Sequence, residues 1–132
     1  MSATFAYLLL SQEPTLRYAC AGHLPPVWVR PGQPARLLDE GRRPLLGYGA
    51  SAESELVTAT APFEPGDTIL LYTDGLIERR VRTLDKGLAL LTAALEELAA
   101  CPADEICAGV IDRLTVDQDI EDDIAVMVVR RR

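Results

Sequence analysis

The sequence has little of what secreted, membrane-spanning or nucleic-acid-binding proteins require. Its three cysteines form no CxxC pair, which favours buried thiols over a disulfide framework or a zinc site. No apolar run reaches the roughly 18 residues of a membrane span, and the first residues carry no basic export signal. A net charge of −7 argues against a general nucleic-acid binder. We therefore expect a soluble, cytoplasmic protein.

Several catalytic motifs are also missing. The sequence has no GxSxG elbow, no GxxxxGK[ST] loop and no GxGxxG after an expected strand. It contains one histidine, so a Ser-His-Asp or Cys-His arrangement would depend on His23 alone. His23 lies in a Gly-His-Leu-Pro-Pro turn, where a structural hydrogen bond is favoured over catalysis, although both roles remain open.

The chain has the length of one domain, and its first half predicts short strands. β-Favouring stretches alternate with polar, proline-containing and glycine-containing turns. The expected strands are 4–10, 16–21, 27–30, 35–38, 53–61 and 68–72. The first two read as an antiparallel hairpin, and the glycine-rich and proline-containing stretch 39–52 predicts an ordered loop.

The second half predicts two helices and a final strand. Leucines recur at helical spacing over 86–100, and a second apolar stripe follows Pro102 to about Leu114. Each helix needs a partner surface, which the strand-rich half supplies. The nearly unbroken apolar run 124–129 predicts another central strand.

Asp74 lies at the end of the most apolar expected strand, 68–72, which reads as central because both of its faces are apolar. A short carboxylate at a strand tip, followed by the flexible Gly75, suits a metal ligand. The alternative is that Asp74 caps a short helical turn over 76–79. The spacing alone favours neither.

A second acidic cluster precedes the last strand. It contains five acids within 117–123, and Asp122 and Asp123 directly precede the apolar run. For Asp117 and Asp119 we favour a solvated loop. If the strands at 68–72 and 124–129 are antiparallel neighbours, Asp74 meets Asp122 and Asp123 at one end of the sheet. Carboxylate oxygens favour magnesium or manganese, and paired ions can activate water for attack on a phosphate. This predicts a metal-assisted phosphohydrolase.

Four motifs in order carry a family resemblance. They are 21–26 (Ala-Gly-His-Leu-Pro-Pro), 44–47 (Pro-Leu-Leu-Gly), 65–76 (Pro-Gly-Asp through Thr-Asp-Gly-Leu) and 121–125 (Glu-Asp-Asp-Ile-Ala). Together they resemble bacterial metal-dependent serine/threonine phosphatases of the stage II sporulation protein E type, which are PP2C-like. The resemblance implies an α+β fold, an antiparallel β-sandwich with flanking helices.

The resemblance also implies an activity. It is the removal of phosphate from phosphoserine or phosphothreonine with two Mn²⁺ or Mg²⁺ ions, typically on an anti-sigma factor antagonist in a partner-switching pathway. Asp74 matches the aspartate of the Thr/Ser-Asp-Gly motif and Asp122 the first acid of the closing motif. Both are thereby implied as catalytic metal ligands, with Asp123 beside them as a further or alternate ligand. Members of the wider superfamily have, at the position of His23, an aspartate that binds a third metal ion. The resemblance therefore implies no third ion bound in that manner here.

The match begins late in the family's domain. Family members start with a strand bearing an Asp-x-x-Gly motif, whose aspartate bridges both metals, followed by two long helices. None of these precedes the expected strand at 4–10, so residues 1–132 correspond to the C-terminal portion of a single domain. We expect this portion alone to be nearly inactive. A catalytically inactive module that binds a partner protein, or itself, through the uncovered sheet is the alternative.

Overall fold

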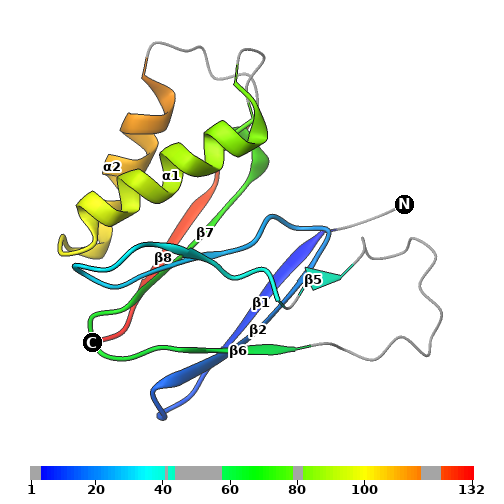
Figure 1. The fold of residues 1–132 in the computed structure, drawn as a ribbon, viewed down its shortest axis with the longest axis vertical. Helices are drawn as coiled ribbons and strands as arrows, with labels where there is room; N and C mark the ends of the chain where they lie inside the picture. Colours follow the sequence, from blue (N-terminus) through cyan, green and yellow to red (C-terminus); the bar gives the residue numbers. More distant parts are fainter. Residues whose placement is uncertain (1–3, 41, 44–57, 79–81, 117–122) are drawn as a thin grey trace.

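The computed structural model describes residues 4–40, 42–43, 58–78, 82–116 and 123–132 of the chain. Within these ranges the elements form three layers: a first β-sheet, a second β-sheet and a pair of α-helices (Figure 1). This arrangement confirms the expected α+β class, with mainly antiparallel sheets and helices on the outside. Neither α-helix in the described part of the chain has the length and apolar character that a membrane crossing requires.

The first sheet is built around β2 (Thr15–Ala21). β1 (Phe5–Leu10) and β6 (Ala59–Pro62) run antiparallel to β2, whereas β5 (Arg42–Arg43) runs parallel to it. The antiparallel register of β1 and β2, with Leu10 opposite Leu16, confirms the hairpin expected at the start of the chain.

Two expectations for this sheet need correction or restriction. β5 lies inside the stretch 39–52, which we expected to be loop throughout. Its two residues pair with Cys20 and Ala21 of β2, a tertiary contact that overrides the local glycine and proline content. Of the strand expected over 53–61, residues 53–57 lie outside the described part, and β6 continues one residue beyond its expected end.

The second sheet has the order β4 (Arg36–Leu37), β3 (Val27–Val29), β7 (Thr68–Tyr72), β8 (Val126–Arg130), with every pair antiparallel. The position of β7 between two strands confirms that it is central. β8 was also expected to be central, but among the described strands it pairs with β7 alone, and Met127 is 60% exposed. Its apolar run instead reflects the helices that pack on one of its faces.

The two expected helices are confirmed with shifted ends. α1 (Leu84–Leu98) begins earlier than expected because Thr83 caps it, its side-chain oxygen accepting a hydrogen bond from the amide of Lys86 at 3.2 Å. α2 (Ala103–Thr115) begins directly after Pro102, which occupies the N-cap position instead of the first helical position.

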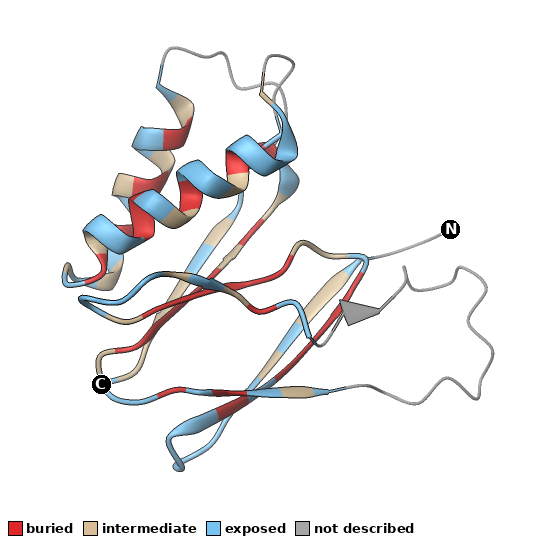
Figure 2. Ribbon diagram, in the orientation of Figure 1, coloured by how far each residue is buried: buried red, intermediate tan, exposed pale blue. Residues whose placement is uncertain are grey.

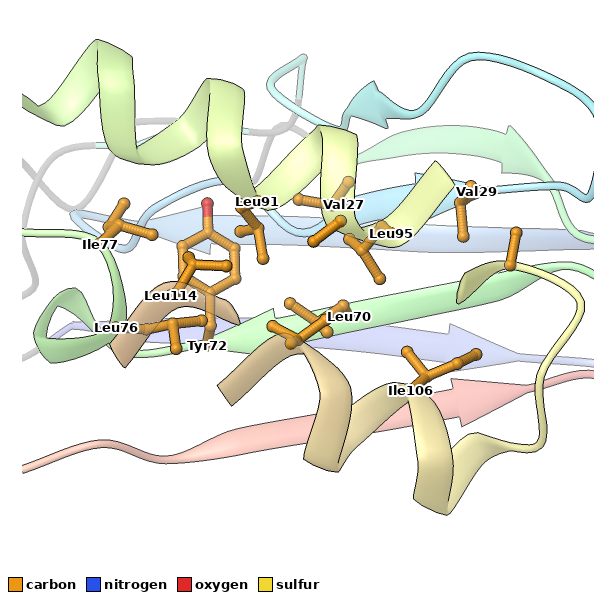
Figure 3. Packing of buried hydrophobic residues seen from close by; sticks show 13 residues of the cluster. Val27, Val29, Leu70, Tyr72, Leu76, Ile77, Leu91, Leu95, Ile106 and Leu114 are labelled. Carbon is orange, nitrogen blue, oxygen red and sulfur yellow. The ribbon is translucent and has the colours of Figure 1, made fainter. Parts of the chain in front are cut away.

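The larger hydrophobic core lies between the second sheet and the helices (Figure 3). Leu70 and Tyr72 of β7 pack in one cluster with Leu91 and Leu95 of α1. The hydroxyl of Tyr72 donates a hydrogen bond to the carbonyl of Pro25 at 2.8 Å, so the buried ring has a partner for its polar end. Each such side chain contributes about 1.5–3 kcal/mol by burial. The end of β7 is therefore held firmly, next to the strand tip that carries Asp74.

A smaller core lies between the two sheets. Leu16 and Tyr18 of β2 pack there with Trp28 of β3 and Ile69 of β7. Figure 2 shows the resulting buried segments along β2 and the second sheet. Alternate residues of β7 thus face opposite cores, which explains why its sequence is apolar on both faces.

A buried ion pair anchors the turn that precedes β7. Asp67 is fully buried, and its two carboxylate oxygens accept hydrogen bonds from Arg30 Nε at 2.6 Å and Nη2 at 2.8 Å. The amide of Glu64 donates a third hydrogen bond at 2.8 Å. Burial alone would raise the pKa of Asp67, but these hydrogen bonds and the charge of Arg30 outweigh it and lower the pKa.

Gly87 lets α1 approach the backbone just after the 74–76 turn. A Cβ at this position would overlap the carbonyl oxygen of Ile77 and lie 3.0 Å from the Cβ of Ile77. Gly87→Ala is therefore expected to lower the free energy of unfolding by about 1–2 kcal/mol, because overpacking against backbone outweighs the gain in helix propensity. Urea unfolding followed by circular dichroism measures this change.

Gly109 on α2 provides a matched control. Its added Cβ would meet Leu98 Cδ1 at 2.8 Å, which is the mobile end of a side chain and not backbone. Gly109→Ala should therefore leave stability unchanged or raise it by up to about 1 kcal/mol through helix propensity. Equal stability of the two variants would contradict the close approach of α1 to Ile77.

Candidate functional site

The two acid-bearing segments lie side by side where β7 ends and β8 begins. Tyr72 is opposite Val126 in the antiparallel register, and the amide of Thr73 donates to the carbonyl of Ala125 at 3.1 Å. The pairing therefore extends beyond the two strands. Asp74 comes directly after Thr73, and Asp123 lies two residues before Ala125, so both acids are near this pairing, as expected for antiparallel neighbours.

Asp74 opens a short 3₁₀ turn, η1 (Asp74–Leu76). Its backbone carbonyl accepts hydrogen bonds from the amides of Ile77 at 3.0 Å and Glu78 at 2.8 Å. The alternative in which Asp74 caps a turn over 76–79 is wrong, because the turn starts at Asp74 itself and Thr73 occupies the N-cap position. The side chain of Asp74 is exposed to solvent.

A cleft of about 310 Å³ lies at this end of the second sheet. Asp74 and Asp123, both exposed, are part of its wall. The full lining consists of Thr4, Gly22, His23, Thr73, Asp74, Gly75 and Asp123. The cleft thus collects residues from the start of β1, the end of β2 and the ends of β7 and β8.

His23 enters this cleft through a tight turn after β2. Gly22 has a φ of +60°, a left-handed conformation that glycine adopts without strain. His23 Nδ1 lies 2.7 Å from the carbonyl oxygen of Leu24, and because a carbonyl only accepts, Nδ1 carries the proton. This contact matches the structural role favoured from the sequence.

Asp122 and the acids at 117, 119 and 121 lie outside the described residues, so their predicted roles are not tested. Among the residues that the structure describes, no three His, Cys, Asp or Glu side chains gather as a metal-binding group. The two carboxylates in the cleft are of the kind that Mn²⁺ and Mg²⁺ prefer. The donors fit such an ion in type, and Asp122 is the nearest further candidate in the sequence.

An apolar groove of about 540 Å³ adjoins the cleft. It runs between the first residues of β1 and the paired ends of β7 and β8, and it includes the exposed Met127. The sequence predicts neither this groove nor the contacts of Thr73, because both depend on the register of strands that are distant in the chain. For Thr73, the one available signal is its position directly before Asp74.

Comparison with known proteins identifies the fold. Residues 1–132 match the family model described as stage II sporulation protein E. The chain is similar to the RsbU and RsbW domains of Rv1364c from Mycobacterium tuberculosis, with 31% identity and a TM-score of 0.80 over 92% of this chain and 33% of that one. It is also similar to the phosphatase domain of SpoIIE from Bacillus subtilis, with 20% identity and a TM-score of 0.72 over 97% of this chain and 58% of that one.

The SiaA-PP2C domain of Pseudomonas aeruginosa gives a comparable match, with 21% identity and a TM-score of 0.69 over 90% of this chain and 47% of that one. The chain thus spans between a third and three fifths of the length of these structures. The two matches to phosphatase domains show a shared PP2C-like fold. Because the family model matches along all 132 residues, the chain belongs to the stage II sporulation protein E family.

Proposed function

We propose that the chain is the C-terminal portion of a single metal-dependent protein phosphatase domain, which removes phosphate from phosphoserine or phosphothreonine. The observation that supports this most is the pairing of Thr73 with Ala125, which brings the segments of Asp74 and Asp123 to one cleft. Carboxylate oxygens are the ligands that Mn²⁺ and Mg²⁺ prefer. Membership of the family adds independent support.

The roles of the acids are proposed from the family resemblance, supported by the placement of Asp74 and Asp123 at one cleft. Asp74 and Asp122 are proposed as ligands that hold Mn²⁺ or Mg²⁺, with Asp123 beside them as a further or alternate ligand. When bound, the ions lower the pKa of a water and neutralise charge on the phosphate. The protein's own contribution is to fix the two carboxylate segments on neighbouring strand ends, so that little reorganisation is needed on binding.

The proposed substrate is a phosphorylated anti-sigma factor antagonist in a partner-switching pathway of the cytoplasm. This proposal rests on the family resemblance and on the similar Mycobacterium tuberculosis structure, which contains RsbU and RsbW domains. The net charge of −7 disfavours nucleic acid as a substrate.

The test is hydrolysis of a phosphoserine-containing protein by the full-length gene product, with and without Mn²⁺. We expect activity that requires Mn²⁺ and disappears with EDTA. Residues 1–132 alone are expected to be nearly inactive, because the family's bridging aspartate is not among them. Activity of the full-length product that is unchanged in EDTA, or no activity at all, would contradict the proposal.

A second candidate function, binding of a protein partner without catalysis, is favoured by a different observation. Tyr7, Leu9 and Leu10 of β1 are each more than 40% exposed, and among the described strands β1 pairs with β2 alone. Exposed apolar side chains on an edge strand favour association with a partner protein or with a second copy of the chain. An inactive full-length product that self-associates in light scattering would support this candidate over the first.

A further inference from the structure

Thr73 has an unusual double role where β7 ends. In a regular antiparallel pair, the amide and carbonyl of Thr73 would both bond to Ala125. The amide does so, at 3.1 Å, but the carbonyl of Thr73 instead accepts from the amide of Leu76 at 3.1 Å. The backbone carbonyl is thus diverted from the sheet into the turn that carries Asp74.

The side chain of Thr73 replaces the diverted carbonyl. Its Oγ1 accepts a hydrogen bond from the amide of Ala125 at 2.9 Å. The same oxygen lies 3.4 Å from the carbonyl of Asp123 and 3.5 Å from that of Ala125, so its proton has an acceptor on the same segment. One hydroxyl therefore keeps residues 123–125 paired while the strand already turns away.

We propose that Thr73 is a positioning residue of the metal site, and that its hydroxyl holds the segments of Asp74 and Asp123 in one register. This inference rests on the proposed function. Without the hydroxyl, the amide of Ala125 loses this partner, and the bond from the Thr73 amide to the Ala125 carbonyl is left to hold the 123–125 segment to the turn. The two acids then have to be reordered at the moment a cation binds, which weakens binding.

The test compares Thr73→Val with Thr73→Ser in the full-length gene product. Valine keeps the shape of threonine and removes the hydroxyl, whereas serine keeps the hydroxyl. Isothermal titration calorimetry with Mn²⁺ alone is expected to show an affinity about 10–100-fold lower for Thr73→Val than for the wild type. Thr73→Ser is expected to stay within about threefold of the wild type, since its hydrogen bond is retained. Thr92→Val, which removes a hydroxyl bonded to the carbonyl of Ala89 on α1, should leave Mn²⁺ affinity unchanged.

Amide hydrogen exchange without metal provides a second readout. The amide of Ala125 is expected to exchange at least about tenfold faster in Thr73→Val than in the wild type or in Thr73→Ser, because its acceptor is gone. If the wild type binds Mn²⁺ and Thr73→Val binds it with equal affinity, the role of Thr73 is overturned and the proposed function stands. A wild type that binds no Mn²⁺ would overturn the proposed function, and the role of Thr73 with it.

Discussion

Asparagine at position 74 is expected to lower the kcat/KM of Mn²⁺-dependent dephosphorylation at least about a hundredfold in the full-length gene product. The carboxylate stands at the tip of a strand held by two cores and faces the same cleft as Asp123. Asparagine keeps the shape but removes the charge that holds a divalent cation in the proposed site, which would cost several kcal/mol in stabilisation of the reacting phosphate. Steady-state kinetics on a phosphoserine protein across a Mn²⁺ titration measures the effect.

The variant should fold normally, because Asp74 is exposed and surface substitutions usually change stability by less than about 0.5 kcal/mol. Asp112→Asn is the matched control, since Asp112 is an exposed aspartate on α2 outside the cleft. It removes the same charge from the molecule and should leave kcat/KM unchanged. Equal activity in Asp74→Asn and the wild type would refute the assignment of Asp74.

The largest effect on stability is expected at Asp67. Asp67→Asn removes the charge that accepts two hydrogen bonds from Arg30, and turns an amide group toward that guanidinium. Because hydrogen bonds to a buried charged group are among the stronger ones, we expect a loss of about 2–3 kcal/mol in the free energy of unfolding at pH 7. Urea unfolding at equilibrium measures it.

The same pair predicts a pH dependence. The pKa of Asp67 is lowered in the folded protein, below the value of about 3.9 that an aspartate has in an unfolded chain. The unfolded state therefore binds the proton first as the pH falls. The contribution of Asp67 is complete above about pH 5 and is lost below about pH 4, toward its folded pKa. The difference in stability between the wild type and Asp67→Asn should shrink in that acidic range.

Glu64 separates the buried interaction from a surface one. Its carboxylate lies 2.9 Å from Arg30 Nη2, but the side chain is 54% exposed. Glu64→Gln should therefore cost less than about 1 kcal/mol. A loss at Glu64 as large as that at Asp67 would show that burial does not determine the strength of this cluster.

The elements with strong local patterns could be predicted from the sequence. β7 was predicted to the residue, because its apolar side chains alternate between two hydrophobic cores, with Ile69 in one and Leu70 and Tyr72 in the other, and a Pro65-Gly66 turn precedes it. Gly66 has a φ of +94°, which this turn requires. The first helix followed from leucine spacing and the second from an apolar stripe after Pro102, and the observed ends differ by one or two residues.

Features that depend on strand pairing could not be predicted. β5 forms because two arginines pair with β2, and nothing in their local sequence indicates a strand. β8 looked central because its residues are apolar, but apolar side chains also occur on an end strand that is covered by helices. At the site, the juxtaposition of Asp74 and Asp123 followed from an assumed antiparallel pairing, whereas the hydroxyl of Thr73 that joins them required the register itself.

The most direct test of the account is a double-mutant cycle on Mn²⁺ affinity with Asp74→Asn and Asp122→Asn in the full-length gene product. If both carboxylates share the same cations, each single variant should bind Mn²⁺ at least about tenfold more weakly. The double variant should then lose clearly less than the sum of the two losses, with a coupling free energy above about 0.5 kcal/mol. Unchanged affinity in either single variant, or strictly additive losses, would contradict a shared site.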